Sequence, residues 1–272
     1  KPLNYREIKM QKPTHLILAY YKFTPLADPK AEVKTHKKFF KDRDIVGRIY
    51  ISEQGINGQV SGSNEDAQAY MDWMLSRPEF SGLDFKPEGH HCNIFERMTV
   101  KYREQLAALD YEKSNFTKQA THLNPEEWKQ VLDEEEPIVL DVRNDYEWEV
   151  GHFKDAVSPP CKTFREFQDF ANKLRENTDP NKKILMYCTG GIRCEAFSPF
   201  MKDLGFKNIY QLKGGVIGYG QKVGSRHWDG KLFVFDDRMT IPISDEETKT
   251  IGQCHCCKGP TSDFFNCANM DC

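Results

Sequence analysis

A glycine-rich loop between a buried strand and a helix constrains the fold of this chain more than any other sequence feature. The apolar segment 183–187 has the pattern of a buried strand, the loop 188–193 reads Cys-Thr-Gly-Gly-Ile-Arg, and residues 195–204 have helical periodicity. Strand and helix patterns alternate in this way through the second half of the chain. We therefore expect an α/β fold there, with a parallel sheet flanked by helices.

Cys188 is the candidate nucleophile of this loop. It lies between a strand end and a helix start, where backbone N–H groups are unpaired and the helix dipole is positive. Arg193 adds a positive charge, and Gly190 and Gly191 allow the backbone to curl and turn its amides inward. These features lower the pKa of a thiol, so we expect a reactive thiolate in an anion-binding cradle rather than a buried, inert cysteine.

Helix-capping patterns mark further elements around the loop. Asn124-Pro125-Glu126-Glu127 is typical of a helix start, and Thr163 with Glu166 has the spacing of a second capping box. Residues 137–141 and 208–212 have the pattern of buried strands, and Gly214-Gly215 follows the second of them. The polar stretch 111–121 is the best candidate for an interdomain linker.

The N-terminal third has the pattern of a small α+β domain. Its apolar segments predict the order β-α-β-β-α-β, which is the ferredoxin-like arrangement. The predicted strands cover residues 15–21, 45–51, 55–62 and a segment that begins at 83–86; the predicted helices cover 28–41 and 64–75, with Ser63 as N-cap. Residues 97–103 alternate and predict a further strand, on which Arg97, Lys101 and Arg103 would form either a basic ridge or an ordinary solvated face.

Composition restricts the compartment and the partners. The chain has 272 residues, 39% of them hydrophobic and 29% charged, and no apolar run long enough to cross a bilayer, so we expect no membrane partner. Its net charge is −3, so a polyanionic partner would need a local basic patch. The chain lacks a secretory leader pattern, and its odd number of cysteines does not suggest a disulfide framework, so we expect a reducing cytoplasm. It begins at Lys1 and ends at Cys272 within a cysteine pattern, so we expect it to be part of a longer protein.

Four separated motifs follow one another along the second half of the chain: Asp141-Val142-Arg143, Glu149-Val150-Gly151-His152-Phe153, the loop from Cys188 to Arg193, and Leu212-Lys213-Gly214-Gly215. In this order they resemble the rhodanese (sulfurtransferase) domain. The resemblance covers about residues 123–224, and it departs from the usual pattern at Asp155, where rhodaneses have glycine. It implies that Cys188 is the catalytic cysteine and that the amides of Thr189, Gly190, Gly191, Ile192 and Arg193 hold whatever is bound to its sulfur.

Further motifs occur along the chain: Glu53-Gln54-Gly55-Ile56-Asn57-Gly58, the extended loop Cys188 to Glu195, Phe233-Val234-Phe235-Asp236-Asp237-Arg238-Met239, and a Cys-rich tail. With them, essentially the whole chain is similar to the bacterial tRNA uridine hydroxylase family. This resemblance implies a ferredoxin-like (acylphosphatase-like) domain at residues 1–112, a rhodanese domain at 122–225 and a Cys-rich extension at 226–272. It also implies tRNA as partner, 5-hydroxyuridine at the wobble position as product, and molecular oxygen as co-substrate, without a certain cofactor.

The Cys188 loop is compatible with other functions as well. The four residues between Cys188 and Arg193 favour sulfur chemistry over the phosphoryl chemistry of related phosphatases, whose loops are one residue longer. The loop would therefore also serve a sulfurtransferase that forms a Cys188 persulfide, and a non-catalytic module that binds RNA or a partner is a third reading. For the hydroxylase, our hypothesis is that the Cys188 thiolate or persulfide adds to C6 of uracil, which makes C5 electron-rich toward O₂.

Several residues near the loop have both a functional and a structural interpretation. Asp141 and Arg143 are expected either to line the pocket or to form an ion pair that stabilises the strand end. We expect His152 to be structural rather than a general base. Cys194 is either a resolving thiol or, as we expect, a buried first-turn residue whose side chain points away from the cradle.

The tail offers a candidate metal site. Cys254, Cys257, Cys267 and Cys272 could hold zinc with four thiolates, and Cys256 is an alternative ligand. The alternative is a tail of free thiols.

The glycine-rich segment 53–62 is a weaker candidate site. We expect Gly55 and Gly58 to serve backbone turns, and Asn57 is a candidate RNA contact beside the ridge of Arg97, Lys101 and Arg103.

Overall fold

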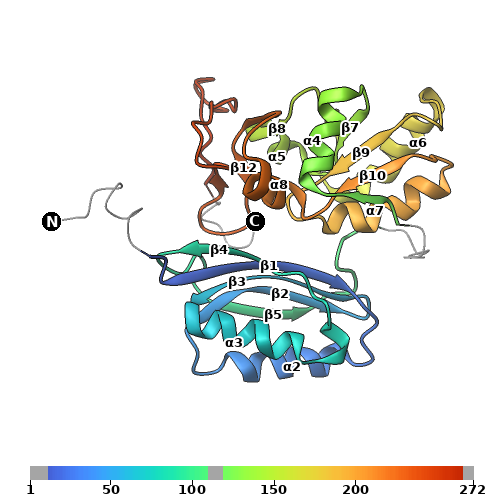
Figure 1. Cartoon of the computed structure of the whole chain (residues 1–272). Coiled ribbons are helices and arrows are strands. Elements are labelled where there is room, and N and C mark those ends of the chain that lie inside the picture. Colours follow the sequence, from blue (N-terminus) through green and yellow to red (C-terminus); the bar gives the residue numbers. More distant parts are fainter. Residues whose placement is uncertain (1–11, 110–118, 266–272) are drawn as a thin grey trace. The chain divides into compact units, whose positions relative to one another are not determined.

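The computed structural model describes residues 12–109 and 119–265. The chain separates into two compact units, Lys1–Leu106 and Ala107–Cys272 (Figure 1). Each unit has hydrophobic clusters of its own. Within the described residues, none of the helices has the length and apolar character needed to cross a membrane.

The first unit is a five-stranded sheet with two helices on one face (Figure 1). Its elements are β1 (His15–Phe23), α2 (Pro29–Phe40), β2 (Ile45–Ser52), β3 (Gly55–Ser63), α3 (Asn64–Leu75), the 3₁₀ turn η1 (Pro78–Phe80), β4 (Lys86–His90) and β5 (Met98–Tyr102). The strand order is β4-β1-β3-β2-β5; β5 is parallel to β2 and the other pairs are antiparallel. The predicted β-α-β-β-α-β order and the additional strand are confirmed.

Local side-chain caps fix the two helices of this unit. The Asp28 carboxylate accepts a hydrogen bond from the Ala31 N–H at 2.8 Å, and the Ser63 hydroxyl accepts one from the Asp66 N–H at 3.2 Å. Both caps satisfy N–H groups that a helix start leaves unpaired. The Ser63 cap is the one that the sequence predicts.

Two predictions in this unit are wrong in detail. The fourth strand begins at Lys86 and not at residue 83, because the chain turns at Gly82 (φ 73°) and the Leu83 side chain is buried in the core. Gly55 does serve the turn after β2, with φ 135°. Gly58 lies inside β3, where a Cβ atom would come within 2.3 Å of the Tyr20 hydroxyl, so close packing and not a turn requires it.

The second unit is a parallel sheet between two layers of helices. Its first elements are β6 (Thr121–Leu123), α4 (Pro125–Glu134), β7 (Ile138–Asp141), α5 (Asp145–Val150), β8 (Gly151–Phe153), the 3₁₀ turn η3 (Phe164–Glu166) and α6 (Phe167–Asn177). They are followed by β9 (Ile184–Tyr187), α7 (Ile192–Asp203), β10 (Ile209–Leu212) and α8 (Gly215–Val223). The sheet order is β6-β10-β9-β7, with every pair parallel, so the predicted rhodanese-like architecture is confirmed.

Strand β9 lies at the centre of this unit and is buried on both faces. Ile184 and Met186 belong to a cluster with side chains of α6 and α7, whereas Leu185 and Tyr187 belong to a cluster with side chains of α4 and α8. Side chains of a strand alternate between faces, so an apolar residue at every position indicates a sheet covered on both sides.

Residues 226–265 are packed into the second unit. They form β11 (Trp228–Gly230), which pairs antiparallel with β8, and the short pair β12 (Leu232–Phe233) and β13 (Thr240–Ile241). Trp228, Leu232 and Val234 lie in the same buried cluster as Trp128 of α4.

The sequence predicts two capping boxes and a linker for the second unit. The capping box at Asn124 and Glu127 is confirmed. The one at Thr163 is wrong: the chain first forms η3, and the Thr163 hydroxyl donates to the Glu166 carboxylate at 3.0 Å instead of capping a helix. In the expected linker 111–121, residues 111–118 lie outside the described part, and Thr121 already belongs to β6.

Candidate active site

Cys188 lies directly after β9, with 1% of its surface exposed. The Gly191 N–H donates a hydrogen bond to its Sγ at 3.1 Å. Burial alone would raise the pKa of the Cys188 thiol, but a hydrogen bond from the Cys194 side chain, the charge of Arg193 and two backbone N–H groups outweigh it. They lower the pKa from 9.0 to about 6, so the expected thiolate is favoured at neutral pH.

The first turn of α8 donates hydrogen bonds to two carbonyl groups of the loop. The Val216 N–H donates to the Cys188 carbonyl at 3.0 Å, and the Ile217 N–H donates to the Thr189 carbonyl at 3.2 Å. Gly215 has φ 65°, and a Cβ atom there would lie 2.5 Å from the Thr189 oxygen. The Gly214-Gly215 pair thus lets a helix start approach the loop carbonyls closely.

The two glycines of the loop differ in what they do. Gly191 has φ 107°, in the left-handed region, and is the N-cap residue of α7. Gly190 has no left-handed φ, and a Cβ atom there would meet no atom within 4 Å. Only Gly191 therefore fulfils the expectation that the loop needs glycine in order to curl.

Arg193 is anchored by a buried carboxylate. Its guanidinium donates to both oxygens of Glu147, at 2.6 and 2.8 Å, and the Thr189 hydroxyl donates to the same carboxylate at 3.2 Å. Burial would raise the pKa of Glu147, but the charge of Arg193 lowers it overall. This paired geometry keeps the Arg193 charge beside Cys188.

Glu147 is the principal residue that the sequence analysis missed. It occupies the third position of α5, and its carboxylate also accepts the Asn144 N–H at 3.1 Å. The Asn144-x-x-Glu147 spacing is a capping-box signal that predicts the helix start but not the pairing with Arg193.

Cys194 is buried as expected, with 1% exposed, but its side chain does not point away from the cradle. Its thiol donates a hydrogen bond to Cys188, and burial together with that neighbouring charge raises the pKa of Cys194 well above its usual value. The first turn of α7 turns this side chain and its own N–H toward the sulfur, so Cys194 is a protonated donor to the Cys188 thiolate.

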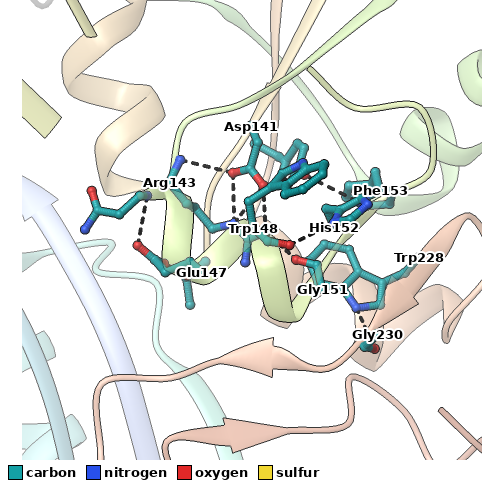
Figure 2. Close-up of polar contacts among 12 residues, drawn as sticks. Asp141, Arg143, Glu147, Trp148, Gly151, His152, Phe153, Trp228 and Gly230 are labelled. Atoms are coloured by element: carbon teal, nitrogen blue, oxygen red, sulfur yellow. Dashed lines mark hydrogen bonds and ion pairs between the residues drawn. The ribbon is translucent and has the colours of Figure 1, made fainter. Parts of the chain in front are cut away.

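Asp141 and Arg143 form a fully buried ion pair (Figure 2). Arg143 donates to the carboxylate at 2.8 and 2.6 Å and to the Gly151 carbonyl at 2.6 Å, and the Tyr187 hydroxyl donates to Asp141 at 2.6 Å. The pair joins the end of β7 to the start of β8. This is the structural interpretation of the two residues, since neither side chain is exposed.

His152 also has the structural role that we expected. Its ring stacks on Trp148 at 3.9 Å between centroids, and its Nδ1 lies 2.8 Å from the Trp148 carbonyl oxygen (Figure 2).

The extension brings aromatic side chains to the loop. The Arg193 guanidinium lies 5.8 Å from the ring centroid of Phe235, which is 43% exposed. Phe233 packs edge-on against both Phe235 and Tyr146 of α5. An exposed ring beside a cationic side chain is suited to stack on a nucleobase.

Known proteins with similar sequences match almost the whole chain. The tRNA uridine(34) hydroxylase of Protochlamydia amoebophila (strain UWE25) is 56% identical over 264 residues, which cover 96% of this chain and 82% of that protein. The chain belongs to the tRNA uridine(34) hydroxylase family. The proteins of that name from Chlamydia pneumoniae and Chlamydia trachomatis serovar D are 52% and 51% identical, each over 94% of this chain and 79% of their own length.

Three family models match successive parts of this tRNA uridine(34) hydroxylase family member. They are described as a UPF0176 acylphosphatase like domain at residues 15–106, a rhodanese-like domain at 124–222 and a rhodanase C-terminal segment at 229–272. The first two match the types of domain that the sequence predicted for these parts of the chain.

One departure from the rhodanese pattern has a backbone explanation. Asp155 has φ 60°, a left-handed conformation that glycine adopts without strain and aspartate tolerates better than most residues. The turn at Asp155 is therefore one in which glycine would also fit without strain.

Two cysteines of the predicted metal site lie in the described residues. Backbone N–H groups of Cys257 and Cys256 donate to the Cys254 sulfur and lower its pKa. Cys267 and Cys272 lie outside the described residues, and residues 12–109 and 119–265 contain no group of three potential metal ligands. Cys254 and Cys257 have the sequence spacing of half a thiolate site.

The basic ridge lies on β5 and its flanks. Arg97, Lys101 and Arg103 are all exposed, and Asn57 is half-buried on β3. The Arg103 guanidinium lies over the Tyr50 ring at 5.1 Å. Contact of these residues with RNA stays a prediction.

Proposed function

We propose that this chain hydroxylates C5 of uridine 34, the wobble uridine of tRNA, in the cytoplasm, with molecular oxygen as co-substrate and Cys188 as nucleophile. The relatives named tRNA uridine(34) hydroxylase support the substrate and the reaction. The observation that carries the role of Cys188 is its low pKa, about 6, in a cradle of hydrogen-bond donors.

A nucleophile at C6 overcomes the low reactivity of uracil toward O₂. O₂ reacts poorly with a closed-shell uracil ring, and adding a thiolate to C6 forms a C–S bond and moves an electron pair toward C5. C5 then bonds to O₂ and, after protonation, carries a hydroperoxide.

Cys194 is positioned to supply the second thiol. Its sulfur takes the outer oxygen of the hydroperoxide and becomes a sulfenic acid, which leaves a hydroxyl on C5. Loss of the C5 proton and departure of Cys188 restore the ring. Cys188 then displaces hydroxide from Cys194, so uridine, O₂ and two thiols give 5-hydroxyuridine, water and one disulfide. A cellular thiol must reduce this disulfide before the next turnover.

Mass spectrometry of tRNA nucleosides tests the function. Cells that lack their own 5-hydroxyuridine pathways should gain the nucleoside with this chain and not with Cys188→Ser. Unchanged 5-hydroxyuridine would overturn the hydroxylase proposal. Sulfur transfer from thiosulfate through a Cys188 persulfide, without hydroxylation, would indicate the sulfurtransferase instead.

A single-turnover reaction tests the two-thiol step. Fully reduced enzyme without added thiol should form at most one equivalent of 5-hydroxyuridine and a Cys188–Cys194 disulfide, found by peptide mapping. Continued turnover without reductant, or product formation by Cys194→Ala at the wild-type yield, would exclude Cys194 as the electron source.

We also propose that the tail binds zinc through Cys254, Cys257, Cys267 and Cys272. The N–H groups that stabilise the Cys254 thiolate support this, since zinc binds thiolates. Metal analysis of the protein should give about one zinc per chain, lost in Cys254→Ser with Cys257→Ser but kept in Cys92→Ser. A zinc content unaffected by the double substitution would refute the site.

A further inference from the structure

The exposed face of α2 carries a row of lysines. Their spacing of three to four residues places most of them on one side of the helix. Figure 1 shows α2 on the helix-covered face of the first unit's sheet, near β5. The lysines are Lys30, Lys34, Lys37, Lys38 and, directly after the helix, Lys41, and all are exposed.

Internal ion pairs do not neutralise this row. The acidic residue within α2, Glu32, is buried on the opposite side, where it pairs with Arg77 at 2.5 Å and His36 at 2.8 Å. In the part of the chain that the structure describes, none of the five lysines takes part in a salt bridge. A concentrated charge that no carboxylate of the described residues neutralises is suited to an external partner.

The neighbouring helix has the opposite character. α3 carries Glu65 and Asp72 on its outer side. Two helices on one face of the same sheet are thus segregated by charge, so a polyanion would be attracted along α2 and repelled from α3.

Strand β5 lies beside the lysine row. α2 packs against β5, and the Lys30 ammonium lies 5.5 Å from the centre of the Tyr102 ring. Lys101 and Arg103 are exposed cations too, but they alternate with Val100 and Tyr102 and therefore lie on the opposite face of the sheet from α2. Asp28, Asp42, Glu53 and Glu104 flank the surface, and Asp28 is occupied as the N-cap of α2.

We propose that the α2 lysines bind the phosphate backbone of the substrate tRNA; this rests on the proposed function. From Lys30 to Lys41 the row is about 16 Å long at 1.5 Å per residue. Duplex nucleic acid carries one negative charge per about 1.7 Å of axis, so the row faces several phosphates. Because the whole chain has a net charge of −3, this local surface supplies the attraction that its overall charge does not.

Backbone contacts position a nucleic acid without reading its sequence. The surface therefore contributes affinity and orientation, and the chemistry takes place elsewhere. Its loss should raise the KM for tRNA and leave kcat at saturating tRNA unchanged.

The test is a charge reversal with a matched control. The variant Lys34→Glu, Lys37→Glu, Lys41→Glu and the control Lys173→Glu, Lys182→Glu, Lys207→Glu change net charge equally, and all six positions are exposed. Binding of unmodified tRNA to the full chain is measured by filter binding at several salt concentrations. We expect the α2 variant to lose at least about tenfold in affinity and its salt slope to fall by about three, with the control within about twofold of wild type.

Four outcomes separate this proposal from its alternatives. Wild-type affinity of the α2 variant would overturn it, as would equal losses in variant and control. Loss of binding to vesicles with an anionic lipid, with tRNA binding intact, would assign the surface to a membrane. If tRNA binds through α2 but the wild type forms no 5-hydroxyuridine, the surface stands and the proposed function fails. Lys34→Gln, Lys37→Gln, Lys41→Gln replaces the variant if circular dichroism shows that the glutamates disturb the fold.

Discussion

At the scale of single residues, two opposing effects act on Cys188. Burial favours the neutral thiol, whereas the Gly191 and Cys194 donors and the Arg193 charge favour the thiolate. The hydrogen bonds and charge prevail, so the folded thiol has a pKa of about 6 instead of 9.0. The reactive form is therefore present at neutral pH and is lost as the pH falls below about 6.

Removing the Cys194 donor should weaken this effect. We expect Cys194→Ala to raise the pKa of Cys188, so that the pH midpoint of its alkylation by iodoacetamide moves upward from about 6. Cys194→Ser keeps a hydroxyl donor and is the control, with a midpoint closer to wild type. Peptide mass spectrometry follows Cys188 specifically, and an unmoved midpoint in Cys194→Ala would show that Arg193 and the amides suffice.

Gly215 and Gly190 should differ in how well they tolerate substitution by alanine. Gly215→Ala forces a side chain into a left-handed conformation and within 2.5 Å of the Thr189 oxygen, so the free energy of unfolding should fall by more than about 2 kcal/mol. Gly190→Ala meets open space and should change it by less than about 0.5 kcal/mol. Urea denaturation measures both, and similar losses would contradict the close approach of α8 to the loop.

The sequence identified the residues of the loop but not all of their partners. Cys188, Gly191 and Arg193 were predictable because a strand, a loop and a helix follow one another along the chain. Glu147 was missed as the partner of Arg193 because the two are 46 residues apart and meet only in the fold. The direction of the Cys194 side chain depends on how the first turn of α7 is seated, which a helical pattern does not specify.

At the scale of elements, the sequence predicted those helices and strands that are stabilised by residues close together in the chain. The helices after Ser63 and Asn124 begin at side-chain caps, and β9 is apolar at every position. The short strands β6, β8 and β11 were not predicted, because each has three residues and exists through its pairing. β6, for example, contains polar Thr121 and His122; it pairs with β10, and His122 contacts the buried Glu195 of α7 at 3.0 Å.

The capping box of α4 gives an element-scale prediction. Asn124→Ala removes the acceptor of the Glu127 N–H and should lower the free energy of unfolding by about 1 kcal/mol. Lys129→Ala, on the same helix, removes only a surface pair with Asp133 and should cost less than about 0.5 kcal/mol. Chemical denaturation compares them, and equal effects would mean that the cap contributes nothing beyond a surface contact.

At the scale of the whole molecule, each unit has a core of its own. Leu18 is fully buried in the first unit and Met186 in the second. We expect Leu18→Ala to destabilise the first unit by about 2–5 kcal/mol while amides of β9 keep their protection from hydrogen exchange, and Met186→Ala to do the reverse. Loss of protection in both units from either substitution would show that they unfold as one.

The pairing of β11 with β8 has a consequence for modularity. The Trp228 indole donates to the Gly230 carbonyl at 3.0 Å, and its ring lies 5.2 Å from the Arg143 guanidinium. A fragment cut where the rhodanese resemblance ends would leave β8 with an unpaired edge and uncover one side of the buried Asp141–Arg143 pair. The rhodanese-like domain therefore cannot be separated from the extension without loss of structure, because the sequence boundary between them divides one hydrophobic core.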